Sequence, residues 1–272
     1  MKPREYKKID FSSLDSALDD LVRHIPRSEL FRAPTRIATM GSCFAGNVSN
    51  ALLKLGHEAV HLSLSETQNT PLVNWAFIDY FVKGRDSEFL GEVARLVGTD
   101  NESLLSRREA IVESVRSCKV FILTIGVGFV WVNEQGNISL NVDARRFSSY
   151  RSVFPSVDQH ASWIESILDG LLKLNSAMKI FVTLSPVPLN FAKFDYSPMI
   201  ADCISKSVLR SAVEIVLKNH PELVYFPSFE FFRWVSGHFS RPFYGADGKV
   251  RHVDEDLVDM VVGKFVEING GA

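Results

Sequence analysis

Residues Thr35–Gly46, TRIATMGSCFAG, begin with the pattern of a buried strand and end with that of a helix. Gly41 allows the backbone to turn sharply between the two, and Ser42 follows it directly. From Cys43 to Leu55 the apolar residues recur every three or four positions, which is typical of a helix. Ser42 is therefore expected at the start of that helix, where free N–H groups and the helix dipole would stabilise an oxyanion.

Three interpretations of Ser42 follow from this position. Serine is a favoured N-cap, so Ser42 can serve the helix alone. A helix N-terminus also binds phosphate groups. In the third interpretation the hydroxyl is a nucleophile that attacks an acyl carbonyl. The neighbouring Cys43 is a rival nucleophile, because a helix N-terminus lowers the pKa of a thiol, although its side chain is expected to pack against the helix interface.

Length and composition limit the classes of protein that the chain can belong to. Its 272 residues suit one large α/β domain or two small ones, and 46% hydrophobic with 23% charged residues predicts a sizeable core. A net charge of −2 favours neither nucleic acid nor an anionic membrane surface as a partner. The three cysteines lack the spacing of a metal site or a disulfide framework. No apolar segment suits a signal or a membrane span, so a cytoplasmic protein is expected.

Strand and helix patterns alternate after an N-terminal arm, residues 1–34, in which one amphipathic helix is expected. This alternation predicts an α/β fold, a doubly wound parallel sheet of five strands with helices on both faces, in a single domain over residues 35–272. A hairpin at 129–133 and 137–142 is expected to leave the main sheet. The predicted strands are 35–41, 57–63, 119–126, 179–184 and 223–226, and the predicted helices are 43–55, 72–83, 87–97, 103–117, 158–174, 199–219 and 253–267.

Polar or small residues follow four of these strands. They are Ser42, Asn69 in the polar turn at 65–71, Gly126 and Ser185. The carboxyl ends of parallel strands meet at one edge of a sheet, and ligands bind in the crevice there. These four residues are therefore predicted to gather at the ligand-binding edge.

A candidate base and its orienting group lie near the C-terminus, in the loop with Asp247 and His252. A serine nucleophile needs a base to accept its proton, and a carboxylate can fix the tautomer of that histidine. A surface histidine and a turn aspartate are the structural alternatives, since Asp-Gly is a strong turn dipeptide. Asp254, Asp256 or a backbone carbonyl could also orient His252.

The chain resembles the GSCFA family, which looks like a branch of the SGNH (GDSL-like) hydrolases. Gly41-Ser42-Cys43-Phe44-Ala45 spells the family signature, and the resemblance covers about residues 35–267. The further matching segments, in chain order, are Thr124–Gly126 with Trp131, Thr183–Leu189, Ser205–Arg210, Tyr225–Glu230, and Phe243-Tyr244 with Asp247 and His252.

The resemblance implies a flavodoxin-like three-layer α/β/α sandwich with a Ser-His-Asp centre formed by Ser42, His252 and Asp247. It also implies an oxyanion or substrate-binding set, namely Gly41, Cys43, Asn69, Gly126 and Gly128. Three departures from the family pattern are visible. The third block reads Gly126-Val127-Gly128 without the usual Asn, and Asn141-Val142-Asp143 stands where the family often has Asn-Cys-His. The spacing from Asp247 to His252 is five positions, where the family usually has three.

The resulting hypothesis is an ester hydrolase or O-acyltransferase that acts on acylated carbohydrate or polysaccharide precursors. Water or a sugar hydroxyl would accept the acyl group, acyl-coenzyme A is a candidate donor, and no cofactor or metal is expected. The alternative is a non-catalytic module of the same fold that binds a phosphate-bearing ligand, such as a nucleotide or coenzyme A, at the helix N-terminus after the first strand.

Overall fold

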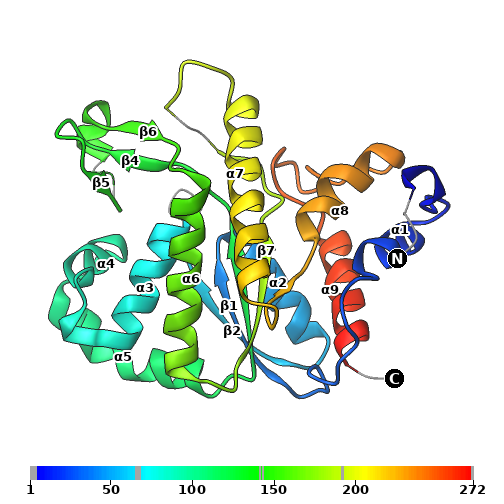
Figure 1. Ribbon diagram of the computed structural model, residues 1–272, viewed down its shortest axis with the longest axis horizontal. Helices are drawn as coiled ribbons and strands as arrows, with labels where there is room; N and C mark the ends of the chain where they lie inside the picture. Colours follow the sequence, from blue (N-terminus) through cyan, green and yellow to red (C-terminus); the bar gives the residue numbers. More distant parts are fainter. Residues whose placement is uncertain (1–4, 65–68, 141, 143, 191–192, 271–272) are drawn as a thin grey trace.

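The computed structural model describes residues 5–64, 69–140, 142, 144–190 and 193–270, and at its centre is a parallel sheet (Figure 1). All neighbouring strands pair in parallel, in the order β2-β1-β3-β7-β8. The strands are β1 (Arg36–Gly41), β2 (Glu58–Ser63), β3 (Val120–Ile125), β7 (Lys179–Leu184) and β8 (Val224–Tyr225). The predicted five-stranded parallel sheet is therefore confirmed.

Helices cover both faces of the sheet because successive strand residues point to opposite sides. Along β3, Val120 and Ile122 belong to one hydrophobic cluster, whereas Phe121 and Leu123 belong to the other. The first cluster includes residues of α1 (Leu14–Val22), α2 (Cys43–Lys54), α8 (Ser228–Trp234) and α9 (Glu255–Asn269). The second includes residues of α3 (Pro71–Lys83), α4 (Leu90–Leu96), α5 (Asn101–Arg116), α6 (Val157–Leu174) and α7 (Pro198–Asn219). The three-layer α/β/α sandwich is confirmed.

Two parts of the fold differ from the sequence prediction. The predicted hairpin is part of a three-stranded antiparallel sheet of β4 (Val130–Val132), β5 (Ile138–Ser139) and β6 (Arg151–Val153), in the order β5-β4-β6. Residue 141 of the predicted hairpin lies outside the described residues. The helix α8 was also missed. Both β6 and α8 are too short for a periodic pattern, and pairing with β4 and packing against the core decide their structure.

The N-terminal arm lies against the C-terminal helix. Ala17, Leu18 and Val22 of α1 are buried in the same cluster as the inner face of α9. The half-exposed carboxylate of Asp19 also pairs with the Lys264 ammonium at 2.8 Å. These contacts make α1 part of the helical layer on that face of the sheet.

The order of the strands places a crevice next to β1. The chain runs from β1 to β2 on one side, while β3 lies on the other side and leads on to β7 and β8. The direction of the crossovers therefore changes between β1 and β3, and such a switch point opens a crevice at the carboxyl ends of the strands. Ser42 follows β1 and Gly126 follows β3, so both residues stand at this crevice.

Candidate active site

Ser42 is the N-cap of α2, yet its side chain makes no capping hydrogen bond. The caps of the other long helices do accept one from a backbone N–H in the first turn; they are Ser13, Thr70, Asp100, Ser156, Ser197 and Asp254. Ser42 therefore occupies the N-cap position without using its side chain to cap the helix. Its hydroxyl instead lines a narrow cavity of about 20 Å³.

The turn into Ser42 requires glycine at position 41. Gly41 has a backbone φ of 145°, a value that residues other than glycine rarely adopt. A Cβ atom here would also lie 2.6 Å from the carbonyl oxygen of Thr124 on the neighbouring strand. The role of Gly41 that the structure supports is close backbone packing that fixes the position of Ser42.

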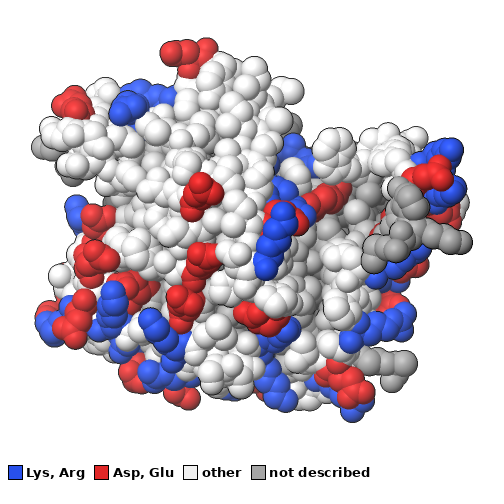
Figure 2. Space-filling model, viewed as in Figure 1, with Lys and Arg blue, Asp and Glu red and all other residues white. Residues whose placement is uncertain are grey.

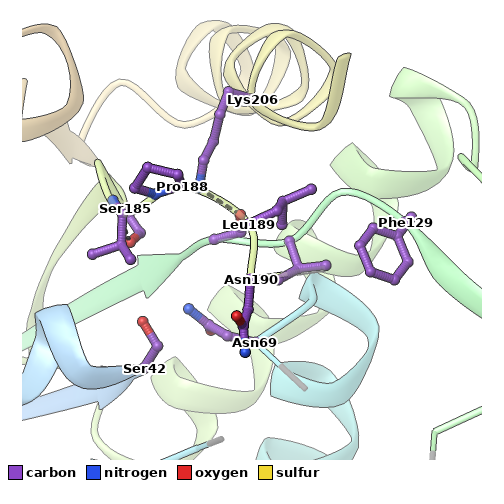
Figure 3. A pocket seen from close by; sticks show the side chains of 11 residues that line it. Ser42, Asn69, Phe129, Ser185, Pro188, Leu189, Asn190 and Lys206 are labelled. Carbon is purple, nitrogen blue, oxygen red and sulfur yellow. Dashed lines mark hydrogen bonds between the residues drawn. The ribbon is translucent and has the colours of Figure 1, made fainter. Parts of the chain in front are cut away.

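Asn69 lies in the same cavity as Ser42 and points its amide nitrogen toward the serine side chain (Figure 3). The side chain is fully buried, and its Nδ2 has no hydrogen-bond partner among the residues that the structure describes. Its Oδ1 accepts a hydrogen bond from Asn74 Nδ2 at 3.2 Å, which holds the amide in this orientation. A buried donor without a hydrogen-bond partner lowers the stability of the fold, so such a donor beside Ser42 marks a place where a ligand's acceptor atom can bind. The prediction that Asn69 faces this site agrees with its place in the cavity, while residues 65–68 before it lie outside the described residues.

The loop after β3 forms the next wall. The backbone N–H groups of Gly126 and Val127 both donate to the carbonyl oxygen of Asn69, at 3.2 and 2.9 Å. A Cβ atom on Gly126 would lie 2.9 Å from Asn69 Nδ2, so glycine is needed for the amide to pack here. The Gly126 N–H already donates to Asn69, so it is not free to donate to an oxyanion. The role that remains for Gly126 is to shape the wall of the site.

Three buried side chains hold the loop at Gly126 and Gly128 from the helices behind it. His160 Nε2 donates to the Gly128 carbonyl at 3.0 Å, and the Gly128 N–H donates to Ser205 Oγ at 2.7 Å. Lys206 Nζ donates to the Gly126 carbonyl at 2.7 Å, as the dashed line in Figure 3 shows. Gly128 is therefore clamped through both of its backbone polar groups and does not line the cavity.

Burial determines the charge of His160. The side chain is fully buried, and the loss of hydration lowers its pKa to about 4, although the hydrogen bond to Gly128 acts in the opposite direction. The imidazole is neutral at pH 7, with Nε2 as the protonated nitrogen that donates to the carbonyl oxygen.

Asp247 and His252 are joined by a hydrogen bond, with Asp247 Oδ2 2.9 Å from His252 Nδ1. The pKa of Asp247 is lowered, first because its carboxylate accepts the Lys249 N–H and also because of the His252 contact. The five-residue spacing is compatible with this contact because the loop closes on itself, with Gly245 N–H donating to the His252 carbonyl at 2.9 Å. The contact expected from the sequence is present.

The competing carboxylates have other partners. Asp254 Oδ1 accepts the Leu257 N–H as the cap of α9, and it also accepts a hydrogen bond from Arg241 at 2.7 Å. Asp256 lies 3.6 Å from the same guanidinium group. Asp247 is thus the carboxylate that contacts His252 in the described structure.

His252 lies in a second cavity of about 420 Å³ that adjoins the cavity of Ser42, since Val187 lines both. Cys43, the residue after Ser42, also lines this second cavity and is exposed. The expectation that Cys43 packs into the helix interface is wrong, because the inward face of α2 begins at Phe44. His252 and Cys43 therefore line one cavity and Ser42 lines the other, with Val187 in the wall of both.

Two polar residues of the Ser42 cavity were not assigned from the sequence. Lys206 is buried in its wall, and the exposed Asn190 points into it (Figure 3). The sequence carries a signal for Lys206, because Asp202, Ser205 and Lys206 recur at three and four positions on α7 and form a polar stripe on its buried face. Asn190 lies in a loop and has no such signal.

The family model of the GSCFA family matches residues 36–265, from the start of β1 into α9. The chain belongs to the GSCFA family. The signature Gly41–Ala45 of this GSCFA protein covers the turn between β1 and α2, with Ser42 at its centre. No curated protein matches the chain by sequence.

Solved structures similar to the GSCFA protein include two esterases and an acetyltransferase domain. A Corynascus thermopiles (Myceliophthora fergusii) carbohydrate esterase family 2 enzyme with a carbohydrate-binding domain has 13% identity and a TM-score of 0.47, over 86% of this chain and 66% of that one. An acetyl xylan esterase of Butyrivibrio proteoclasticus has 10% identity and a TM-score of 0.45, over 86% and 63%. The periplasmic domain of a Salmonella Paratyphi A lipopolysaccharide acetyltransferase has 11% identity and a TM-score of 0.36, over 97% and 98%. The chain spans about two thirds of the length of the two esterases.

The described residues offer neither a metal site nor a membrane span. They contain no group of three or more His, Cys, Asp or Glu side chains that could hold a metal ion. None of the helices in the described part of the chain has the length and hydropathy that crossing a bilayer requires.

Proposed function

We propose that this GSCFA protein is a serine esterase or O-acyltransferase. The observation that carries the proposal is that one cavity is lined by Ser42, whose hydroxyl makes no capping hydrogen bond, and by Asn69, whose buried Nδ2 donor has no partner among the described residues. A serine nucleophile must be accessible to the substrate, and an oxyanion donor must have no competing partner before the substrate binds.

In the first half of the reaction, Ser42 Oγ attacks the acyl carbonyl and its proton passes to His252. The Asp247 carboxylate, 2.9 Å from His252 Nδ1, holds the ring in the tautomer whose Nε2 accepts that proton. The negative charge on the carbonyl oxygen is stabilised by the N-terminus of α2 and by Asn69 Nδ2. The alcohol then leaves with the proton from His252, and the acyl group stays on Ser42.

The missing Asn of the third block has a replacement in this mechanism. Asn69 supplies an amide donor from the loop before α3, and the buried Lys206 adds a positive charge to the same cavity. Removal of one oxyanion donor costs about 10²–10³ in kcat in a well-studied serine protease, so such a replacement matters.

In the second half, His252 takes a proton from water or from a sugar hydroxyl, which attacks the acyl-enzyme and releases Ser42. Water gives an esterase, and a sugar hydroxyl gives an O-acyltransferase for which acyl-coenzyme A is a candidate donor. The family resemblance favours acylated carbohydrate or polysaccharide precursors as the molecules modified.

The test uses a fluorophosphonate probe and p-nitrophenyl acetate with the wild type and two matched variants, Ser42→Ala and Cys43→Ala. Labelling and turnover are expected in the wild type and in Cys43→Ala, and both should be lost in Ser42→Ala, whose melting temperature should stay within a few degrees. Loss in Cys43→Ala alone would assign the chemistry to the thiol. A wild type that neither labels nor turns over would contradict the proposal and favour the ligand-binding module.

A further inference from the structure

A large groove opens from the Ser42 cavity between α7 and α8. We call it the α7–α8 groove; the described residues that line it are in 188–190, 198–211 and 229–234, together with Arg251. Its volume is about 860 Å³, and it shares Pro188, Leu189, Asn190 and Lys206 with the cavity of Ser42. The mechanism above uses none of its outer part, which is large enough for a sugar ring or a longer group.

The lining of the α7–α8 groove has more cations than carboxylates, whereas the cavity around His252 has more carboxylates than cations. Its described lining has four cations, Lys206, Arg210, Arg233 and Arg251, against the two carboxylates of Asp202 and Glu230. Figure 2 shows blue and red side chains gathered in the hollow between α7 and α8. The described lining of the cavity around His252 has four carboxylates, Asp247, Asp254, Glu255 and Asp256, against the one cation of Lys249. A substrate with an anionic group would therefore be oriented with that group in the groove.

The guanidinium of Arg233 keeps donor capacity for a ligand. Its Nε donates to the Pro186 carbonyl at 3.1 Å and its Nη2 donates to Asp202, while Nη1 makes no hydrogen bond to a described residue. Asp202 in turn accepts the Leu189 N–H at 2.9 Å, so the guanidinium is held in place by a buried network. A fixed planar donor of this kind suits a carboxylate or phosphate.

The rim of the groove exposes flat and flexible apolar side chains. Trp234, at the end of α8, is 67% exposed, and Met199, near the start of α7, is 80% exposed. Phe231 and Phe232 of the same helix are fully buried, so the exposure is confined to Trp234 at the end of α8. Exposed large apolar residues that cluster beside a site mark a binding surface. The C–H face of a sugar ring packs well on an indole.

We propose that the α7–α8 groove binds the alcohol part of the ester, a sugar ring that carries a carboxylate or phosphate. This inference rests on the proposed esterase or acyltransferase function. The cations in the lining favour a ligand with an anionic group, and the narrow cavity at Ser42 is left for the acyl group. The groove begins at the wall of the Ser42 cavity, so a sugar ring that bears the ester oxygen can lie in the groove while its acyl group is at Ser42. A ligand in the groove therefore needs no long linker, such as the pantetheine arm of coenzyme A, to place its acyl group at Ser42.

The first experiment measures binding without chemistry, by calorimetry with glucuronic acid, glucose 6-phosphate and glucose. At least one of the two anionic sugars should bind at least tenfold more tightly than glucose, and added salt should weaken that preference. The two anionic sugars distinguish a carboxylate from a phosphate as the recognised group. Equal binding of all three sugars, or none, would overturn the proposal even if Ser42 is an active nucleophile.

The second experiment compares Trp234→Ala with the matched variant Leu53→Ala, which truncates a 50% exposed residue of α2 outside the groove. For an O-acetylated form of the preferred sugar, Trp234→Ala should lower kcat/KM at least tenfold, mainly through KM. Turnover of p-nitrophenyl acetate should not change, and Leu53→Ala should leave both substrates unaffected.

Unchanged turnover of the sugar ester in Trp234→Ala would overturn the assignment of the groove. A selective loss of acetyl-coenzyme A turnover would overturn it too, because the groove would then hold the acyl donor. If p-nitrophenyl acetate is not hydrolysed by the wild type, the proposed function fails, and calorimetry with Trp234→Ala still decides whether the groove binds the sugar.

Discussion

The buried imidazole of His160 should make the stability of the protein depend on pH. Its pKa is about 4 in the fold against 6.5 ordinarily, because burial penalises the charged ring. Between these two values the unfolded chain binds a proton that the folded chain does not. Stability from this group is therefore complete above pH 6.5 and is lost as the pH falls toward 4.

The size of this effect follows from the two pKa values. A change from 6.5 to about 4 corresponds to about 3 kcal/mol of unfolding free energy when the unfolded state is fully protonated. About 2 kcal/mol of it should disappear between pH 7 and pH 5. The buried position of His160 leaves little solvent screening to reduce the effect.

The assay is denaturant unfolding of the wild type and of His160→Gln at several pH values from 5 to 8. Glutamine keeps an N–H donor for the Gly128 carbonyl but does not titrate. The stability advantage of the wild type over this variant should shrink by about 2 kcal/mol from pH 7 to pH 5. The difference between variant and wild type isolates His160, because the other titrating groups are common to both.

Ser205→Ala is the matched control, since it removes the partner of the Gly128 N–H without removing a titrating group. Its loss of stability, about 1–3 kcal/mol for an unsatisfied buried donor, should be the same at every pH. A pH-independent difference for His160→Gln as well would refute the assignment of a neutral, buried imidazole.

Three further variants test the site with acetyl ester turnover. Asp247→Asn should lower kcat by up to about 10⁴-fold by favouring the wrong His252 tautomer, with unchanged melting; wild-type kcat would show that another group orients the ring. Gly126→Ala should lower kcat by about 10²–10³-fold, because the added Cβ would lie 2.9 Å from Asn69 Nδ2 and displace that donor. A rise in KM with an unchanged kcat would contradict this prediction. Lys206→Gln keeps a donor for the loop but removes the charge, so kcat should fall about tenfold or more at constant KM, and an unchanged kcat would exclude an electrostatic role.

Much of the fold was predictable because it depends on local patterns. The strand Lys179–Leu184 and the helices on either side of it have enough residues for a clear periodicity. The short strand β6 and the seven-residue α8 do not, and each depends on a partner distant in the sequence. The exposure of Trp234 was not predictable from the sequence either, because it lies in the same short segment as Phe231 and Phe232, which are buried.

The amino-acid sequence by itself determined the strand–turn–helix at Ser42, the family and the two residues of the Asp247–His252 pair. Those features depend on short segments, where residue type and spacing limit the backbone. Only the tertiary structure decided that Ser42 does not cap its helix, that Asn69 keeps a donor free, and that Lys206 enters the cavity. The hydrogen bond from Lys206 to Gly126 joins residues 80 positions apart, and no local pattern encodes such a contact. The packing of α6 and α7 against the sheet brings these groups together, because side chains can meet across a crevice only after the layers on either side have assembled.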